Sequence, residues 1–390
     1  MIKIIQGDCL QTVKSLEDKS INTCVTSPPY WGLRDYDEDA QLGLEESPEE
    51  FVQNLVTLFS EIKRVLRDDG TVWLNLGDSY AGNNSRASNN GRAGYGTERE
   101  GVFNKTGQGL KNKDLVGIPW RVAFALQQDG WYLRQDIIWH KPNPMPESVT
   151  DRCTKAHEYI FLLTKSSKYY YDNEAIKEDS KYYGKDSRSD KGNIRYEGKR
   201  TEGADNLAQQ SFVTIDEKKN KRSVWTVTTK PFKDAHFATF PMDLIKPCVL
   251  AGCPEKVCII CNQPYIRKVI SKRVLRNELP VSDVRYRPNK YEGSYKDING
   301  KADAGYTKTS DLGLEKQCDC DTNKTKRGVV LDPFGGSATT GILAEGNNRD
   351  SIMLELNPEY INIAKQRIQN EFGMFTKIEI NKGETSDTTT

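Results

Sequence analysis

The sequence predicts an α/β protein whose core is a parallel sheet. Three observations lead to this prediction. An apolar strand near the N-terminus ends in the turn Ser27–Tyr30, and a capped amphipathic helix precedes the strand Thr71–Leu76. Near the C-terminus, the strand 328–332 runs through a glycine-rich turn into a helix and a further strand ending at Glu355. Strands that alternate with helices in this way form βαβ units, in which neighbouring strands run parallel.

The N-terminal segment contains two predicted strands and two predicted helices. Apolar residues predict strands over Ile2–Ile5 and Ile21–Val25 and a first helix over Leu10–Leu16. The second helix begins at Ser47, because a Ser N-cap followed by Pro and by a Glu three residues later is a capping box. Asp68-Asp69-Gly70 is expected to end it. Apolar residues recur along it at helical spacing and are Phe51, Leu55, Leu58, Phe59, Ile62, Val65 and Leu66.

The later elements continue the alternation. Helices are predicted from Ile118 to Leu126, around Leu244–Leu250, and from the cap Asn357 to Ile368. The strands predicted among them are Trp131–Trp139, Glu158–Leu163, Tyr169–Tyr171, 328–332 and 350–355.

Changes in composition divide the chain into six predicted segments. The first, third and fifth carry the apolar pattern of one α/β domain, and the second is polar, basic and without periodicity. The fourth is a basic insertion with a cysteine cluster, and the sixth is a C-terminal tail. The segments are 1–176, 177–222, 223–255, 256–327, 328–375 and 376–390.

The formal net charge of +1 conceals an uneven distribution. Residues 181–222 hold 11 Lys/Arg against 7 Asp/Glu, and residues 262–327 hold 15 against 9, so the remainder of the chain carries −9. An acidic body with two basic insertions favours a polyanionic partner that the insertions contact. Lys-rich solvated loops are a common alternative explanation of charge alone.

The short apolar stretch at the N-terminus and the shortness of all other apolar runs predict a cytoplasmic protein. Met1–Ile5 is too short for a signal peptide and is followed by Gly7-Asp8. No apolar run approaches the roughly 18 residues that a membrane span needs, so no membrane partner is expected. In a reducing compartment, clustered cysteines favour metal binding over disulfides.

The turn Ser27-Pro28-Pro29-Tyr30 is a candidate catalytic turn. Proline lacks an N–H and pushes the residue before it to extended geometry, so this backbone is stiff and its carbonyls are free of a ladder. Acceptors beside an aromatic ring suit a planar molecule that carries an amino group. An ordinary strand-ending turn would have the same four residues.

The turn after the strand 328–332 predicts a nucleotide-type ligand with a ribose. Glycines let the backbone approach a ligand at the carboxyl end of a strand, and Glu355 at the end of the next strand can accept hydrogen bonds from ribose hydroxyls. The spacing in Gly335–Gly341 is neither a dinucleotide fingerprint nor a P-loop. A ligand with ribose but without pyrophosphate therefore fits best.

Taken together, Thr26–Tyr30 and Asp332–Gly341 resemble the motifs of the amino-group DNA methyltransferases, which use S-adenosylmethionine to methylate exocyclic nitrogens. The resemblance covers most of residues 1–265 and 328–372. It implies a Rossmann-like methyltransferase fold, circularly permuted as in the β class, because the catalytic motif precedes the cofactor motif. The other similar stretches are Leu76–Tyr80, Ile118–Trp120, Ile138–Asn143, His157–Tyr159 and His236–Pro241.

This resemblance implies a role for individual residues. Asp332, Phe334, Gly335, Gly336 and Ser337 would line the methionine side of the cofactor. Ser27, Pro28, Pro29 and Tyr30 would form the catalytic turn. The residues implied around the rest of the cofactor are Glu355 at the ribose, Asp8 at the adenine amino group, and Phe240 and Pro241 against the same ligand. The sequence departs from the family at Ala338, where Gly is frequent, and we expect little consequence.

The expected reaction needs no nucleophile on the protein. Ser27 and the Pro28 carbonyl can accept hydrogen bonds from the amine, while Tyr30 stacks on a base that has been flipped out of the helix. Methylation of cytosine C5 would need a cysteine nucleophile, and Pro247-Cys248 lies in a predicted helix. Family members with Ser at the first motif position mostly act on cytosine N4, so Ser27 favours N4-cytosine over N6-adenine.

Four cysteines in the basic insertion predict a structural zinc site. Cys258-x-x-Cys261 and Cys318-x-Cys320 can supply four thiolates in tetrahedral geometry. Related methyltransferases carry a similar insertion between the same elements, which implies a small zinc-ribbon-like fold. Cys253 could substitute as a ligand.

The sequence therefore predicts a site-specific methyltransferase acting on duplex DNA, with residues 177–222 as its target-recognition region and a cognate restriction endonuclease as a partner. N6-adenine methylation is the first alternative. A non-catalytic, zinc-dependent DNA-binding protein is the second, and methylation of RNA or protein amides is a third.

Overall fold

The computed structural model describes most of the α/β body of the chain. The described residues are 1–33, 38, 40–82, 109–180, 218–229, 240–275, 305–373 and 376–382, without the side chains of 273–275 and 305–308. Most of the predicted recognition region 177–222, the centre of the basic insertion and the end of the tail lie outside these ranges. The chain divides into two compact units, one of Met1–Asp172, Arg222–Tyr265 and Lys316–Thr390, the other of Asn173–Lys221 and Ile266–Glu315.

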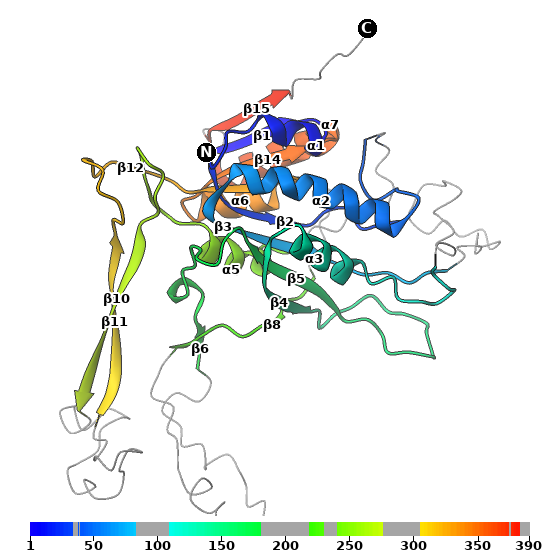
Figure 1. Cartoon of the computed structure of the whole chain (residues 1–390), viewed down its shortest axis with the longest axis horizontal. Coiled ribbons are helices and arrows are strands. Elements are labelled where there is room, and N and C mark those ends of the chain that lie inside the picture. The colour runs from blue at the N-terminus through cyan, green and yellow to red at the C-terminus, as the bar shows by residue number, and fades with distance from the viewer. Residues whose placement is uncertain are drawn as a thin grey trace, which may run out of the picture. The chain divides into compact units, whose positions relative to one another are not determined.

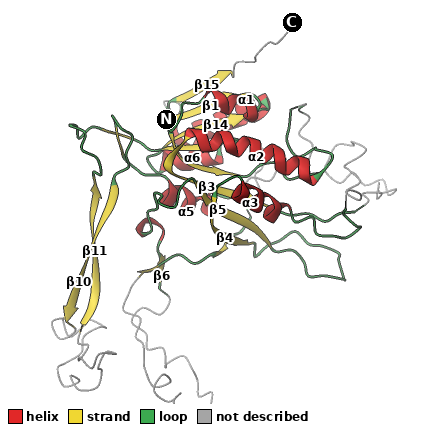
Figure 2. Ribbon diagram, in the orientation of Figure 1, coloured by secondary structure: helices red, strands yellow, loops and turns green. Residues whose placement is uncertain are grey.

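The first unit is built on a nine-stranded sheet (Figures 1 and 2). Strands β1, β14, β13, β2 and β3 run parallel in that order, and β15 adds in parallel to β1. Beyond β3, strand β5 is antiparallel to both β3 and β4, so the sheet is mixed rather than wholly parallel as predicted. In spatial order the strands are β15 (Ile378–Lys382), β1 (Ile2–Gln6), β14 (Asp350–Glu355), β13 (Val329–Asp332), β2 (Ile21–Thr26), β3 (Leu66–Leu76), β5 (His157–Thr164), β4 (Tyr132–His140) and β8 (Val224–Thr226).

Helices cover both faces of this sheet. On β3, the alternate residues Val72, Leu74 and Leu76 join the main apolar core with helices α2 and α3. Trp73 points to the other face, where a Cβ on Gly252 of helix α5 would lie 2.5 Å from its indole nitrogen. The helices are α1 (Cys9–Thr12), α2 (Pro48–Val65), α3 (Ile118–Gln128), α5 (Met242–Gly252), α6 (Thr339–Gly346) and α7 (Pro358–Phe372), with the 3-10 turns η1 (Val13–Ser15) and η2 (Glu174–Ile176).

Local sequence signals account for most element boundaries. The Ser47 hydroxyl accepts a hydrogen bond from the Glu50 N–H at 3.0 Å, which confirms the predicted N-cap of α2. The first predicted helix is broken into α1 and η1. Helix α2 ends at Val65 rather than at Asp68–Gly70, because Leu66 already belongs to β3 and pairs with Ile21 of β2.

The predicted strand Tyr169–Tyr171 is wrong. These residues lie in no strand, although the Tyr170 N–H donates to the Asp69 carbonyl and the Tyr171 ring stacks on Trp73. These three consecutive tyrosines pack against their surroundings rather than pair in a sheet. No helix among the described residues is long and apolar enough to cross a membrane.

The second unit contains a long antiparallel ribbon. Strands β10 (Ile266–Leu275) and β11 (Gly305–Glu315) pair along their length, with an irregularity between Arg267 and Val269. Ion pairs join Arg267 to Asp311 and Lys268 to Glu315. The unit also holds the short pair β6 (Glu178–Asp179) and β7 (Lys218–Lys219), whereas the pair β9 (Val257–Cys258) and β12 (Thr325–Lys326) belongs to the first unit.

Candidate active site

A cavity of about 630 Å³ opens at the carboxyl edge of the parallel strands. Its walls come from the turns that follow β1, β2, β13 and β14, and from the ends of β3, β4 and β5. This edge is where ligands bind in open α/β sheets. The volume is in the range of small-molecule sites.

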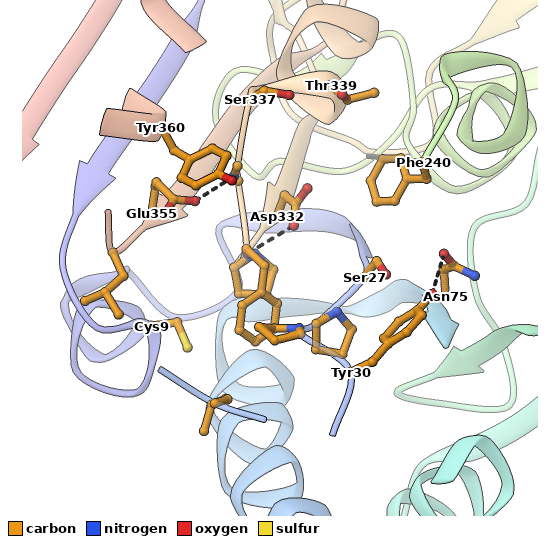
Figure 3. A pocket seen from close by; sticks show the side chains of 18 of the residues that line it. Cys9, Ser27, Tyr30, Asn75, Phe240, Asp332, Ser337, Thr339, Glu355 and Tyr360 are labelled. Carbon is orange, nitrogen blue, oxygen red and sulfur yellow. Dashed lines mark hydrogen bonds between the residues drawn. The ribbon is translucent and has the colours of Figure 1, made fainter. Parts of the chain in front are cut away.

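The cavity brings together residues that the sequence places more than 300 positions apart. Both the turn after β2 and the turn after β13 line it, and Phe240 contributes from the segment before α5 (Figure 3). Pro241 does not line the cavity and is the N-cap residue of α5. The predicted site residues that do line it are Asp8, Ser27, Pro28, Pro29, Tyr30, Phe240, Asp332, Phe334, Gly335, Gly336, Ser337 and Glu355.

We call one end of the cavity the tyrosine end, formed by Tyr30, Asn75, Trp139, Lys141 and Glu158. The Tyr30 hydroxyl donates to Glu158 Oε2 at 2.7 Å, and the Asn75 amide donates to the same oxygen at 3.4 Å. Glu158 Oε1 forms an ion pair with the Lys141 ammonium group, which also lies 4.2 Å from the centre of the Trp139 ring. These contacts fix the Tyr30 ring at the cavity wall.

A glycine on the neighbouring strand end makes room for this ring. A Cβ on Gly77 would lie 2.4 Å from Cε2 of Tyr30, closer than any real contact. The Tyr30 ring therefore packs directly on the backbone after β3. Only a residue without a side chain allows this approach.

The opposite end, the glycine end, consists of Asp332–Ser337 and Glu355 (Figure 3). Asp332 is 2% exposed and accepts three hydrogen bonds, from the Thr26 hydroxyl at 2.7 Å, the Thr340 hydroxyl at 2.6 Å and the Phe334 N–H at 3.1 Å. Burial raises its pKa to about 7. Because Thr26 directly precedes Ser27, Asp332 joins the turn after β13 to the turn after β2.

Glu355 holds the backbone of the glycine turn. It accepts hydrogen bonds from the Gly336 N–H at 2.6 Å and the Asn357 N–H at 2.9 Å, and burial raises its pKa. From behind the turn, Arg367 donates to the Ser337 hydroxyl at 2.9 Å and to the Thr339 hydroxyl at 2.8 Å.

Ala338 has a left-handed backbone, with φ +65° and ψ +30°, and is fully buried. This conformation strains a residue that has a Cβ. The departure from glycine therefore has a structural consequence that the sequence analysis did not expect.

The charges of the lining side chains are strongly unbalanced. Among the described residues, Lys141 is the only cation that lines the cavity, and five carboxyl groups line it as well, of which Asp332 is only partly charged at neutral pH because its pKa is about 7. Such a lining suits a ligand with hydroxyl donors and positive charge, and it disfavours a pyrophosphate. The five are Asp8, Glu38, Glu158, Asp332 and Glu355.

No role was predicted for Asn75, Trp139, Lys141 or Glu158. Three of them lie in stretches already noted as similar to the methyltransferases, Ile138–Asn143 and His157–Tyr159. Their position at the cavity follows from the antiparallel pairing of β4 and β5, which aligns Trp139 with Glu158. That pairing carries no local sequence signal.

Four cysteines form a separate cluster in the first unit. One sulfur atom from each of Cys258, Cys261, Cys318 and Cys320 lies within 4.8 Å of the other three. Backbone N–H groups of Cys261 and Ile260 lower the pKa of Cys258 to about 6, and neighbouring thiols together with burial raise the pKa of Cys320 to about 12. Four sulfurs so close cannot all be thiolates without a cation between them, and a tetrathiolate set is the donor set that zinc prefers.

The other cysteines of interest lie apart from this cluster. Cys253 is fully buried and its thiol contacts the Pro254 carbonyl, so it is not one of the clustered ligands. Cys24 is buried in β2, and Cys248 is buried in α5, the helix that was predicted to contain it. Cys9 lines the cavity, but burial and the neighbouring Asp8 raise its pKa well above the usual thiol value.

The chain is similar to a family of DNA methylases and to several known methyltransferases. Residues 21–260 and 319–366 match a family model described as DNA methylase. The type II methyltransferase M.Cfr9I of Citrobacter freundii is 40% identical over 375 residues, which are 94% of this chain and 88% of that protein. The type II methyltransferase M.SmaI of Serratia marcescens is 38% identical over 371 residues, with 94% and 90% coverage. Among solved structures, the cytosine-N4-specific PvuII DNA methyltransferase aligns with a TM-score of 0.49 and 14% identity, covering 97% of this chain and 94% of that one.

Proposed function

Because the chain belongs to the DNA methylase family, we propose that it transfers the methyl group of S-adenosylmethionine to the exocyclic N4 of cytosine in duplex DNA. One observation carries the proposal. The turn Ser27–Tyr30 and the turn Asp332–Ser337 line one cavity, and Asp332 joins them through the Thr26 hydroxyl. An amine acceptor site and a ribose-type ligand site are thereby held at a fixed separation.

The cofactor fits the glycine end by its chemistry. S-adenosylmethionine has ribose hydroxyls, an adenine amino group and a positive sulfonium centre, and it has no phosphate. Glu355 and Asp8 line the cavity and can accept hydrogen bonds from the hydroxyl and amino groups, and the excess of carboxylates favours the cation. When bound, the cofactor supplies an electrophilic methyl group.

The protein's part in the transfer is to hold the amine. The target base must leave the duplex to reach the cavity. There the Ser27 hydroxyl and the Pro28 carbonyl accept hydrogen bonds from the amino group, and the Tyr30 ring, fixed by Gly77 and Glu158, offers its face for stacking. In-line placement against the methyl group is a proximity effect, and it requires no covalent intermediate.

The decisive experiment uses duplex DNA and labelled S-adenosylmethionine, followed by nucleoside analysis. We expect N4-methylcytosine from the wild type and at least a hundredfold less from Ser27→Ala with Tyr30→Ala. A product consisting only of 5-methylcytosine, or DNA binding without any methylated product, would overturn the proposal. The second outcome would favour a non-catalytic DNA-binding protein.

Ser27 supports cytosine N4 as the target, with adenine N6 as the alternative. Nucleoside analysis of the same reaction separates the two products. A Ser27→Asp variant that retained its activity on cytosine would show that the choice of base depends on other residues.

We propose further that the cysteine cluster binds a structural zinc ion. Metal analysis of the purified protein should find about one zinc per chain, and Cys258→Ser should lose it together with several degrees of melting temperature. The exposed Cys153 lies outside the cluster, so Cys153→Ser is the matched control and should keep the metal. Full zinc content in Cys258→Ser would contradict the site.

The ribbon β10–β11 is our candidate for a DNA contact outside the cavity. Lys272 is exposed and has no acidic partner among the described residues, whereas Lys268 is paired with Glu315 at 2.5 Å. A lysine bound to phosphate releases about one counterion. Lys272→Ala should therefore reduce the slope of log affinity for DNA against log salt concentration by about one. Lys268→Ala should change it less, because the lysine is already neutralised. Equal slopes for both variants and the wild type would rule the ribbon out.

Two broader parts of the proposal concern the fold and the partner. We interpret the motif order as a circular permutation of the methyltransferase fold, supported by the position of the late strand β13 beside β2 in the sheet. Because the relatives reported above are type II methyltransferases, we also propose a restriction endonuclease of the same specificity as a partner in the cell.

A further inference from the structure

We propose that Lys141 binds the ring nitrogen next to the target amino group, which is N3 in cytosine and N1 in adenine. The inference rests on the proposed function, because it assigns the residue that reads the extruded base. It holds for either base, since both place an unprotonated ring nitrogen beside the amine. Lys141 is thus a specificity-determining residue in addition to the catalytic turn.

Lys141 is fixed in place from two sides. Its ammonium group forms an ion pair with Glu158 and lies over the Trp139 ring at 4.2 Å. The side chains of Lys141 and Glu158 are only 19% and 15% exposed, so the pair is held at the cavity wall rather than in solvent. Glu158 also accepts from Tyr30, and this places Lys141 beside the ring on which the base would stack.

A count of hydrogen-bond donors at the tyrosine end singles out Lys141. The Tyr30 hydroxyl donates to Glu158, and the indole N–H of Trp139 donates to the Val227 carbonyl at 2.8 Å. The Asn75 amide donates to Glu158 and to the Tyr159 carbonyl. Of the three N–H bonds of Lys141, one is directed to Glu158 and the Trp139 ring faces the ammonium group, which leaves a donor without an oxygen acceptor among the described residues. Within the tyrosine end, Lys141 therefore holds the donor left for a base.

The neighbouring Asn143 does not compete for this role. Its amide donates to the carbonyl and hydroxyl oxygens of Thr229 at 3.2 and 3.0 Å, and its carbonyl accepts from the Thr229 N–H at 3.1 Å. The whole side-chain amide is thus used to tie the segment after β4 to the segment after β8. Asn143 shapes the cavity wall and leaves base recognition to Lys141.

The resulting pattern matches an amino base and rejects a keto base. Ser27 and the Pro28 carbonyl offer acceptors to the amine, and Lys141 offers a donor to the adjacent nitrogen. Thymine presents an oxygen and an N–H at the same two places, so both interactions would be lost and a donor would face the ammonium group. A buried site built for one hydrogen-bonding pattern discriminates strongly against the reverse pattern.

The test combines an enzyme variant with a modified base. Duplexes carry either cytosine or 3-deazacytosine at the target position, and methyl transfer is measured with the wild type and with Lys141→Met. The deaza substitution should lower kcat/KM more for the wild type than for Lys141→Met. We define the coupling as the ratio of these two fold-changes and expect it to be about tenfold or more, as for a hydrogen bond from a charged donor. Any intrinsic effect of the analogue on flipping or on amine reactivity is common to both enzymes and cancels.

Lys165→Met is the matched control. Lys165 is 18% exposed and paired with Asp68, but it does not line the cavity, so this variant should respond to the deaza base as the wild type does. Binding of S-adenosylhomocysteine should stay near the wild-type value in both variants, whereas Lys141→Met should lower the melting temperature because Glu158 loses its ion pair. For an adenine target the same cycle uses 1-deazaadenine.

Coupling below about twofold in a folded Lys141→Met protein would overturn the inference. If that variant does not fold, Lys141→Arg and Glu158→Gln take its place. Arginine keeps a donor and should retain part of the coupling, and loss of the ion pair in Glu158→Gln should weaken it. Absence of methyl transfer by the wild type to any base would instead refute the proposed function, so the two failures are distinguishable.

Discussion

The two ends of the cavity are held together by different kinds of hydrogen bond. At the glycine end, Glu355 accepts from the backbone N–H groups of Gly336 and Asn357. Asp332 accepts from one backbone N–H and two threonine hydroxyls. At the tyrosine end, Glu158 of β5 contacts side chains from the turn after β2, from β3 and from the residue after β4. Apart from the bond between Asp332 and Thr26, the first end is fixed within its own turns, and the second by the pairing of distant strands.

This difference indicates how each end can fail. A change at the tyrosine end should impair placement of the base and leave cofactor binding intact. A change at the glycine end should weaken cofactor binding before it affects placement of the base. The variants below separate the two, in order of decreasing expected effect.

Gly77→Ala should have the largest effect. The new Cβ would lie 2.4 Å from the Tyr30 ring, so the ring must move, and misplacement by about an ångström can cost about a hundredfold in rate. We expect kcat for methyl transfer to fall by about that factor, while calorimetric binding of S-adenosylhomocysteine stays unchanged. Gly82→Ala is the control, because its Cβ would meet only Asn112 Oδ1 at an ordinary 3.5 Å. A fully active Gly77→Ala enzyme would show that Tyr30 need not be fixed.

Asp332→Asn should reveal a pH dependence of the glycine end. The folded protein keeps the proton of Asp332 up to a pKa of about 7, whereas the unfolded chain releases it near 3.8. Between these values the folded state binds more protons, so rising pH lowers the free energy of unfolding by up to about 1.4 kcal/mol per unit, and the loss ends above pH 7. Asparagine does not ionise. In denaturant titrations from pH 5 to 8, the free energy of unfolding of the variant should therefore rise relative to that of the wild type up to pH 7. A constant difference would mean that Asp332 is ionised throughout.

Arg367→Met should weaken cofactor binding rather than slow the transfer step. Arg367 is the donor that holds Ser337 and Thr339 from behind the glycine turn, and burial lowers its pKa. Without it we expect about tenfold weaker binding of S-adenosylhomocysteine, comparable to the loss of one hydrogen bond to a charged group. The rate at saturating cofactor should change little. Lys365→Met on the exposed face of the same helix should bind as the wild type does.

Ala338→Gly should have the smallest effect, and it should stabilise the protein. Relief of the left-handed strain gains about 1–2 kcal/mol, and loss of a buried methyl group costs about 0.8 kcal/mol. The free energy of unfolding should therefore rise by about 0.2–1.2 kcal/mol. Ala344→Gly, in the regular part of α6 and equally buried, should lower it instead. A loss of stability in both variants would mean that the methyl group of Ala338 matters more than its backbone angle.

Much of the glycine end could be predicted from the sequence. The strand before Asp332, the turn glycines and the strand that ends at Glu355 are contiguous segments, and their strand–turn–helix–strand order fixes where they meet. The cap at Ser47 was predictable for the same reason, since its partner lies three residues away. The Ser27–Tyr30 turn was recognisable because its prolines restrict the backbone directly.

The tyrosine end could not be predicted in the same way. Glu158 reaches Tyr30 across 128 positions, and this contact depends on β5 running antiparallel to β3, which no local pattern signals. The role of Gly77 could not be predicted either, because a glycine after a strand indicates a turn but not which ring packs against it. The strain at Ala338 also emerged only from the backbone angles.

The sequence by itself determined most strands and helices of the first unit, the two turns that carry the methyltransferase motifs, and the four cysteines of one cluster. These features depend on neighbouring residues, through capping, periodicity and backbone restriction. The tertiary structure alone decided which side chains face one another across the cavity. It placed Asp332 between the two turns, the Tyr30 ring on Gly77, and Lys141 as the described cation among five carboxyl groups, because such contacts follow from the order and direction of strands in the sheet.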